Sequence, residues 1–335
     1  MAARRAVDLG HSPTLLGRDE ERLASLAGEL DLPHAAVALE DGESVRAALE
    51  GLAAVLHCAG PFQDTTAMML QACLDTGTHY LDITGELDVI EATATRTDEA
   101  TSKGVVLMSA VGFDVVPSDC LAVHLSNRLP TATRLTIALD PNTRPSHGTA
   151  TTALRGRSDA AVRRDGRLVS APVASKQRIV DFGFDRGEAT ASLIKWADLA
   201  TAYRSTGIGN IETYAALPPD VLLGLKIASR LGFLIRVPVF ARTVIKSLTG
   251  GEHGPSEAQR EADASWLFGE VEDDGGARAA ARLRMPHAYT LTAWTSVETT
   301  VRVAAGGVAP GFQTPATAFG PDFILEFDGV EREDI

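Results

Sequence analysis

The sequence predicts an α/β protein: a doubly wound parallel sheet that lacks its first strand, joined to a second domain of the α+β kind. Over the first 115 residues, short and nearly continuous apolar runs alternate with amphipathic segments. Such runs are typical of parallel strands covered by helices on both faces. From about Thr131, apolar and polar residues alternate instead, as in a sheet with one face in water.

The elements of the first part follow one another in a strand–helix order. The helix expected at 19–30 shows apolar residues at helical spacing, namely Leu23, Leu26, Ala27 and Leu30. The strands expected in this part lie at 14–17, 35–39, 53–58, 79–83 and 104–108. The helices between them are expected at 43–50, 65–75 and 86–102, and Pro117 is placed to open a further helix.

The second part contains strands of the alternating kind and several helices. Leu135, Ile137 and Leu139 alternate with polar residues, and two such runs within 266–283 flank a hairpin turn at 273–276. A helix is expected at 221–234 and another at 289–305. This pattern indicates an α+β domain followed by a C-terminal helical segment.

Composition excludes several classes of protein. The chain has 335 residues, of which 45% are hydrophobic and 22% charged, so it is globular rather than disordered. Its net charge of −13 argues against a nucleic-acid partner, because phosphate binding needs clustered Lys and Arg. Three cysteines without a C-x-x-C pair fit a reducing compartment. No signal peptide or membrane-spanning window is found, and the expectation is a cytoplasmic protein.

Polar residues and glycines follow each predicted strand of the first part. Parallel α/β sheets bind ligands at the carboxyl ends of their strands, so these residues are candidates for a binding site. Arg18 suits the 2′-phosphate of a dinucleotide, with an ordinary surface arginine as the alternative. Thr84 and Glu86 could orient a substrate or, equally, begin a helix as its N-cap and first-turn acid. The turn at 59–62 could let the backbone approach a ligand closely or, equally, be an ordinary turn between a strand and a helix.

Other chemistries lack their sequence signatures. The sequence contains no G-x-S-x-G, no H-E-x-x-H and no G-x-x-x-x-G-K-[ST], which are the motifs of esterases, zinc proteases and NTPases. The eight histidines are scattered without metal-ligand spacing, so no metal site is expected.

Together the strand-end motifs resemble those of the saccharopine dehydrogenase-like NAD(P)-dependent oxidoreductases. The matching stretches are 17–23, 58–62, 80–86 and 112–119, and 311–321 resembles the family's closing segment. The similarity is to members described as saccharopine dehydrogenase-like oxidoreductases and trans-acting enoyl reductases. It implies a Rossmann domain, a substrate domain and a final helix that packs back on the first domain. The expected boundaries are 1–118, 119–286 and 287–335.

The resemblance also implies which residues line the cofactor and the hydride-transfer cleft. The residues expected to contact NADP are Gly17, Arg18, Asp19, Ala59, Gly60, Pro61, Thr84, Gly85, Gly112 and Phe113. The residues expected to polarise or protonate the substrate are Asp82, Glu86 and Asp114.

One departure concerns the N-terminus. Family members begin with a strand and a glycine-rich turn that holds the pyrophosphate at a helix N-terminus. Here residues 1–5 resemble the second half of that first helix, which ends at Gly10, and no G-x-G-x-x-G occurs anywhere. We therefore expect the first strand and the glycine-rich turn to be missing, as in a sequence truncated at its N-terminus.

Two hypotheses of function follow. The first is an NADP-dependent oxidoreductase that transfers hydride to a C=C or C=N bond of a small or lipid-like substrate. The second is a non-catalytic binding or scaffolding descendant that has lost its phosphate-binding loop. The segment 221–246 carries five basic residues and no acid among apolar ones, which suits peripheral contact with an anionic membrane or a buried helical pair. Oligomeric state and substrate identity stay open.

Overall fold

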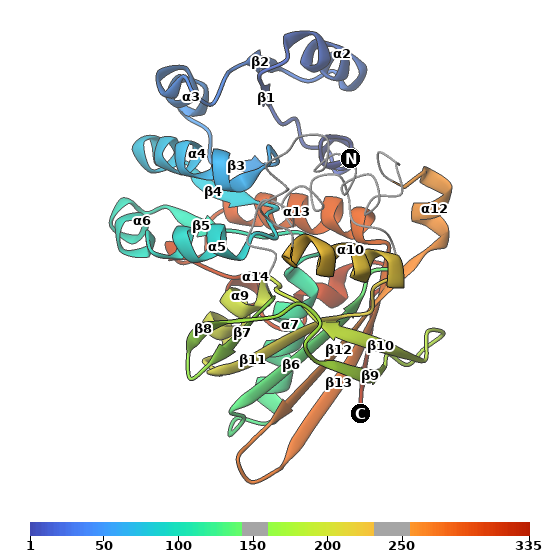
Figure 1. The fold of residues 1–335 in the computed structure, drawn as a ribbon. Helices are drawn as coiled ribbons and strands as arrows, with labels where there is room; N and C mark the ends of the chain where they lie inside the picture. Colours follow the sequence, from blue (N-terminus) through green and yellow to red (C-terminus); the bar gives the residue numbers. More distant parts are fainter. Residues whose placement is uncertain (143–159, 231–254) are drawn as a thin grey trace.

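The computed structural model describes residues 1–142, 160–230 and 255–335, and it confirms an α/β fold with parallel sheets (Figure 1). The helices of the first part are α1 (Ala2–Asp8), α2 (Glu20–Leu30), α3 (Gly42–Leu49), α4 (Phe62–Thr76), α5 (Leu87–Ala94) and α6 (Thr97–Lys103). Its strands are β1 (Leu15–Gly17), β2 (His34–Ala36), β3 (Ala54–His57), β4 (His79–Asp82) and β5 (Val106–Met108).

A four-stranded parallel sheet forms the centre of this part, in the order β14-β5-β4-β3. Its two faces are buried by different helices. Tyr80 and Leu107 pack with residues of α3, α4 and α6, whereas Leu81 and Met108 pack with Val303 of α13 (Ala288–Ala304) on the other face. Each strand places successive side chains on opposite faces of the sheet, so a continuous apolar run packs against the helices on both faces. The sheet is therefore doubly wound.

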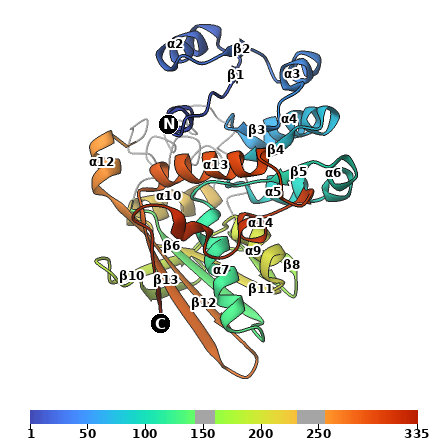
Figure 2. The ribbon, with the colours of Figure 1, turned by 180° about the vertical axis from the view of Figure 1, so that it is seen from behind.

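Strands β1 and β2 form a separate parallel pair, with Leu15 opposite His34. Among the described residues, neither strand of this pair is hydrogen-bonded to the four-stranded sheet. Figures 1 and 2 show the pair standing apart from β3 on the side away from the second sheet. Helix α1 packs on α13, where Arg5 stacks over the Trp294 ring, and Gly10 follows its end with a φ of +82°.

Two local expectations are wrong. The helix expected at 86–102 is divided into α5 and α6. The division arises because the Thr95 hydroxyl donates to the carbonyl of Ala92, and the Arg96 amide donates to the carbonyl of Thr93 instead of to the one four residues back. Thr84 is not a helix N-cap: Glu86 occupies the N-cap of α5, and its amide donates to the Thr84 hydroxyl.

The second part is built on a larger, mostly antiparallel sheet. Its strands are β6 (Arg134–Asp140), β7 (Ala160–Arg164), β8 (Arg167–Ala171), β9 (Gln177–Asp181), β10 (Glu188–Leu193), β11 (Asn210–Ala215), β12 (Ala264–Glu272) and β13 (Arg278–Pro286), with β15 (Glu331–Asp334). The order is β15-β13-β12-β6-β11-β10-β9, and β7 pairs with β11 and β8. As expected, β12 and β13 form a hairpin whose turn lies at 273–277.

Helices α7 (Val116–Arg128) and α9 (Asp198–Thr206) cover one face of this sheet. There Leu135, Ile137 and Leu139 are buried in the largest core cluster. A Cβ atom on Gly269 of β12 would lie 2.7 Å from Leu125 of α7, so the glycine permits close helix–sheet packing.

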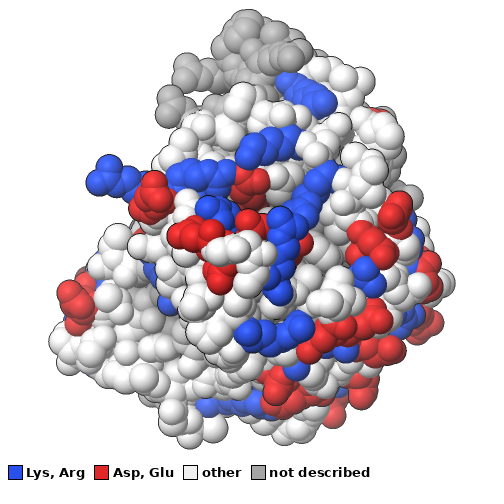
Figure 3. Space-filling model, turned by 90° about the horizontal axis from the view of Figure 1, so that it is seen from below, with Lys and Arg blue, Asp and Glu red and all other residues white. Residues whose placement is uncertain are grey.

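The opposite face is covered too, so the expectation of one face in water is wrong. Ala138, Tyr214 and Trp266 are buried in a second cluster on that side. The hairpin of β9 and β10 lies across it, held by the bond from Arg178 to Glu270. In the view from below, basic and acidic side chains lie interleaved over much of the surface (Figure 3).

The C-terminal segment contributes to both sheets. Strand β14 (Gly311–Phe312) pairs in parallel with β5, and β15 pairs with β13. Between them lie α14 (Pro315–Phe319) and the 3-10 helix η2 (Phe323–Glu326). The remaining helices are α10 (Pro219–Arg230) and α12 (Glu257–Ala262). Most of the basic, apolar segment 221–246 lies outside the described residues. Within the described ranges, no helix is long and apolar enough to cross a membrane.

Candidate active site

The carboxyl ends of β3, β4 and β5 meet at one edge of the parallel sheet. The backbone after β3 is open to solvent at Ala59 and Gly60. The loop after β4 contains Thr84 and Gly85, and the loop after β5 leads to Asp114 at the start of α7. Ligands of doubly wound proteins bind at this kind of edge. The structure thus brings three of the four sequence motifs together.

Asp82 lies at the end of β4 and is 0% exposed. Its carboxylate accepts four hydrogen bonds: from Tyr80 and Ser109 at Oδ2 and from the amides of Thr84 and Ala110 at Oδ1, at 2.8–3.0 Å. Burial raises its pKa, and these donors act in the opposite direction. Ala110 has a φ of +62°, unusual for a residue with a side chain, so Asp82 holds the loop after β5 in shape.

Glu86 is buried and bound to the N-terminus of α4. Its two carboxylate oxygens accept the amides of Phe62 and Gln63 at 2.9 and 3.0 Å. A carboxylate is favourable at a helix N-terminus, where amide groups lack partners within the helix. Glu86 therefore ties the loop after β4 to the loop after β3.

Asp114 differs from both. Its side chain is partly exposed, and it makes no hydrogen bond with the described residues, although Trp196 donates to its main-chain carbonyl at 2.8 Å. Burial raises the pKa of the Asp114 carboxyl to about 6. An acid of this pKa holds a proton in a useful fraction of molecules near neutrality.

The other predicted cofactor residues fall into two groups. Gly112 and Phe113 are buried against α13, where the Phe113 amide donates to Thr292 at 3.1 Å, and Thr84 is fully buried. Arg18 is exposed after β1 and forms no ion pair with any described residue. Asp19 caps α2 by accepting the Arg22 amide at 3.1 Å.

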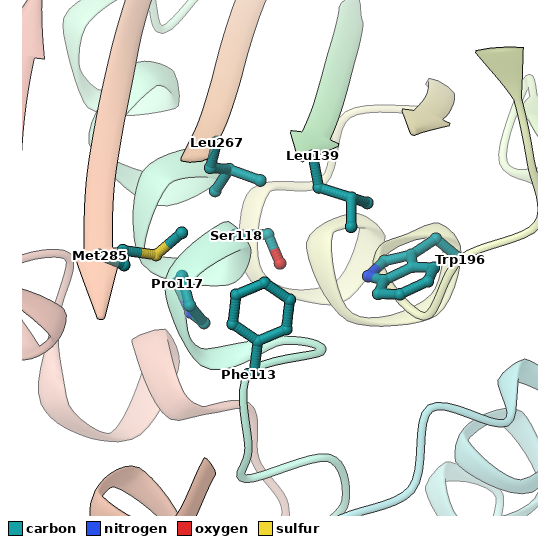
Figure 4. Close-up of a pocket in the computed structure, with 7 residues that line it drawn as sticks. All are labelled: Phe113, Pro117, Ser118, Leu139, Trp196, Leu267 and Met285. Atoms are coloured by element: carbon teal, nitrogen blue, oxygen red, sulfur yellow. The ribbon is translucent and has the colours of Figure 1, made fainter. Parts of the chain in front are cut away.

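A small apolar pocket lies between the loop after β5 and the second sheet (Figure 4). About 200 Å³ of space lies within it when open solvent is included, and the enclosed part has room for about one water molecule. Phe113 and Trp196 point into it, and Leu139 of β6, Leu267 of β12 and Met285 of β13 line it from the second sheet. Its lining residues are Phe113, Pro117, Ser118, Leu139, Trp196, Leu267 and Met285. Ser118 contributes a hydroxyl and Trp196 an indole N–H that donates to the Asp114 carbonyl, and the other five side chains are apolar.

Residues 1–108, which carry β1 to β5, match the family model described as the saccharopine dehydrogenase NADP binding domain. The match covers about a third of the chain and concerns that part alone. The resemblance stated from the motifs is thereby confirmed, and the match supports binding of a nicotinamide cofactor by this domain, here called the NADP-binding domain.

Two named relatives share this region. A saccharopine dehydrogenase-like oxidoreductase of Mus musculus is 32% identical over 123 residues, which is 35% of this chain and 29% of the relative. A trans-acting enoyl reductase of Mycobacterium leprae is 34% identical over 122 residues, which is 34% of this chain and 29% of the relative. The similarity thus spans under a third of the relatives' length.

The fold is similar over the whole chain to saccharopine dehydrogenase (L-Glu forming) of Saccharomyces cerevisiae. The TM-score is 0.66 at 10% identity, covering 100% of this chain and 97% of that one. At this identity the likeness shows the fold alone. It agrees with the Rossmann-type architecture of the NADP-binding domain and the second sheet.

Sequence reasoning missed most of the pocket. Leu139, Trp196, Leu267 and Met285 come from four distant segments, and each reads in the sequence as an ordinary core residue. Ser118 stood within a quoted motif, but nothing marked it as a lining residue. Among the described residues, no group of three His, Cys, Asp or Glu side chains is arranged to hold a metal ion.

Proposed function

We propose that the protein is an NADP-dependent oxidoreductase that transfers hydride to a C=C or C=N bond of a small or lipid-like substrate, in the manner of an enoyl reductase. One observation carries the proposal. The loop after β5 follows directly on a strand of the NADP-binding domain. Phe113 of the same loop lines the apolar pocket. A substrate bound at the solvent-open mouth of that pocket would therefore lie at the edge where the cofactor of such a domain binds.

Residues at this edge fit a nicotinamide dinucleotide phosphate. The guanidinium of Arg18 is exposed and would bind the 2′-phosphate, because arginine pairs with phosphate through two parallel hydrogen bonds. Asp19, which would favour a ribose hydroxyl, is engaged in capping α2. The open backbone at Ala59 and Gly60 would contact the dinucleotide without steric hindrance. When bound, the cofactor supplies the hydride.

Asp114 would supply the proton. Reduction of a C=C or C=N bond adds hydride to one atom and a proton to the other, so a protonated group must stand beside the bond. Asp82 and Glu86 are saturated by protein donors, whereas the Asp114 side chain has no hydrogen-bond partner among the described residues and a pKa of about 6. After the transfer, the carboxylate regains a proton from water through its exposed side.

A binding titration and a turnover assay test the proposal. NADPH fluorescence should change on addition of the protein, with saturation at micromolar concentrations. NADPH absorbance should then fall when a 2-hexenoyl thioester or 2-methyl-1-pyrroline is added. Binding without oxidation of NADPH by any C=C or C=N compound tested would contradict the enzymatic proposal.

The alternative is a non-catalytic binding protein, which the structural engagement of Asp82 and Glu86 favours. It predicts no NADPH binding in the same titration. Contact with a membrane belongs to this alternative, because Leu223 and Ile227 lie one turn apart on α10 and are 58% and 40% exposed. Co-sedimentation with vesicles of anionic lipid tests that contact, and a protein that stays in the supernatant contradicts it.

A further inference from the structure

His57 is a buried polar residue that the proposed reaction does not use. It ends β3, is only 3% exposed, and directly precedes the exposed backbone at 58–60. Two aromatic rings hold its imidazole: the Phe62 ring lies edge-on with 5.5 Å between centroids, and the Tyr80 ring lies at 6.1 Å. The ring nitrogen Nε2 is 3.0 Å from the Thr65 hydroxyl of α4. A buried polar network of this kind holds its members in one arrangement.

The Thr65 hydroxyl shows in which direction this hydrogen bond runs. Its oxygen also lies 2.7 Å from the main-chain oxygen of Ala59 and 3.1 Å from that of Pro61. A carbonyl oxygen can only accept, so the one hydroxyl hydrogen is donated to a carbonyl, and Ala59 is the nearer. The hydroxyl oxygen then accepts from His57, whose Nε2 carries a hydrogen. Burial lowers the pKa of His57 to about 4, so this ring is neutral at pH 7.

The bond to the Ala59 carbonyl fixes the peptide group between Ala59 and Gly60. This peptide is trans, and in a planar trans peptide the C=O and the following N–H point in opposite directions. The carbonyl points toward Thr65 of α4, so the Gly60 N–H points away from that helix, and Gly60 itself is exposed. The hydrogen-bonded chain from His57 through Thr65 thus sets the direction of one backbone donor at the carboxyl end of β3.

The Gly60 amide is the donor that the start of this turn leaves for a ligand. Pro61 has no N–H, and the amides of Phe62 and Gln63 bind the Glu86 carboxylate. The Gly60 amide makes no hydrogen bond with the part of the chain that the structure describes. An exposed amide beside the carboxyl ends of parallel strands is placed to donate to a bound dinucleotide.

We propose that His57 and Thr65 are positioning residues that aim the Gly60 N–H at an oxygen of the bound NADP. Gly60 is the residue that touches the cofactor, and the two side chains act through it. The proposal rests on the proposed function, because it concerns the same cofactor edge, and it adds how the loop after β3 is arranged before binding. A donor fixed in advance binds more tightly, since the peptide group does not have to be ordered on binding.

Selective isotope labelling tests the proposal at a single peptide group. The sequence has three Ala–Gly pairs, so a protein labelled with ¹³C-carbonyl alanine and ¹⁵N-glycine should give three carbonyl–amide cross-peaks, from 27–28, 59–60 and 305–306. Gly28 lies inside α2 and the Gly306 amide is bonded to a main-chain carbonyl, so both are internal controls. NADPH should shift the Gly60 cross-peak far more than the other two and slow its exchange with water.

Variants at Thr65 test the hydroxyl. Thr65→Val should change the Ala59 carbonyl shift even without ligand, because that carbonyl loses its donor. NADPH should then bind about 3- to 10-fold more weakly, the effect of one hydrogen bond, and the Gly60 response should be lost. Thr65→Ser keeps the hydroxyl and should behave as the wild type. Thr76→Val is the control, because Thr76 ends the same helix and its hydroxyl bonds the Ala72 carbonyl at 2.9 Å.

Variants at His57 test the imidazole and decide the matter if Thr65→Val fails to fold. His57→Gln keeps an N–H at a similar reach and should retain the Gly60 response. His57→Phe keeps the ring packing without the donor and should weaken both the response and the binding of NADPH. Equal behaviour of these two variants would show that His57 does not position the loop.

Two further outcomes would overturn the proposal: NADPH binding that leaves the Gly60 cross-peak in place, or a folded Thr65→Val with the wild-type carbonyl shift and NADPH affinity. Failure of the reaction is a separate result. A protein whose Gly60 amide responds to NADPH, but which oxidises no NADPH, keeps this inference and loses only the reaction. Absence of NADPH binding in the fluorescence titration overturns both.

Discussion

Gly85 and Asp114 lie so close together that a Cβ atom on Gly85 would collide with Oδ2 of Asp114. The absence of a side chain at 85 leaves the Asp114 carboxyl its position between the loops after β4 and β5. No described donor satisfies that carboxyl, so its chemistry is set by burial and by what binds next to it.

Asp114→Asn should lower kcat roughly 10²- to 10⁴-fold with NADPH binding unchanged, because a proton donor contributes about that much. In the wild type, activity should fall as pH rises through about 6, where the carboxyl loses its proton. Rates measured from pH 5 to 8 check both points. The matched control is Asp88→Asn, a strongly exposed acid on α5 that is expected to be neutral. A flat pH profile in this range would remove Asp114 from the mechanism.

The same substitution should stabilise the protein at pH 7. The pKa of Asp114 is raised in the folded chain, so the folded state binds more protons than the unfolded state between about pH 3.8 and 6. The free energy of unfolding therefore falls as pH rises through that window. Asp114→Asn removes the penalty, with a gain of about 1–3 kcal/mol at pH 7 and little gain at pH 3. Urea unfolding at the two pH values measures this, and an equal gain at both would show another cause.

Arg18→Ala should weaken NADPH binding about ten- to a hundredfold relative to NADH, since a charge-assisted hydrogen bond contributes roughly 1.5–3 kcal/mol. Arg22→Ala is the control, because its side chain is 88% exposed one turn further along α2. Fluorescence titration with both cofactors gives the ratio. The same preference in both variants would place the 2′-phosphate elsewhere.

Glu91→Gln should destabilise the protein by roughly 2–4 kcal/mol, because it leaves a buried cation without its partner. The Glu91 carboxylate on α5 binds Arg163 of β7 and Arg204 of α9, and the Arg163 side chain is only 5% exposed. The pair joins the NADP-binding domain to the second sheet. Glu99→Gln, in an exposed network on α6, should cost less than about 1 kcal/mol. Chemical denaturation that finds equal losses would contradict the buried-pair argument.

Gly269→Ala should destabilise by about 1–3 kcal/mol, because the added methyl group would meet Leu125 at 2.7 Å and Leu121 at 3.0 Å. Gly28→Ala is the matched control, with a stability change of opposite sign expected. Nothing lies within 4 Å of a Cβ atom there, and alanine in a helix interior should add up to about 1 kcal/mol. Thermal unfolding of both variants should show shifts of opposite sign, and a stabilised Gly269→Ala would disprove the close packing.

Much of the fold could be predicted because local patterns decide it. The apolar runs around Leu56, Leu81 and Leu107 became parallel strands, since each buries both faces between helices. The hairpin at 273–277 followed from its turn residues, and Pro117 opens α7 as expected. The break between α5 and α6 could not be foreseen, because it depends on one hydroxyl competing for a backbone carbonyl.

The candidate site was predictable only where it follows strand ends. Asp82, Glu86 and Asp114 all stood out as acids after strands, but their surroundings come from distant segments. Asp82 accepts hydrogen bonds from four donors and Glu86 from two amides, whereas the Asp114 side chain accepts none from the part of the chain that the structure describes. No spacing in the sequence encodes this difference. Trp196 and Met285 reach the pocket through tertiary packing alone.

The pairing of β14 with β5 and of β15 with β13 has a consequence for biosynthesis. Translation is vectorial, and β5 leaves the ribosome about 200 residues before its neighbour β14. Until then, one edge of each sheet is unprotected, and exposed edges are where nascent chains associate wrongly. Completion of both sheets therefore awaits the last strands to emerge, and a chaperone that shields a nascent chain would act on this protein through most of its synthesis.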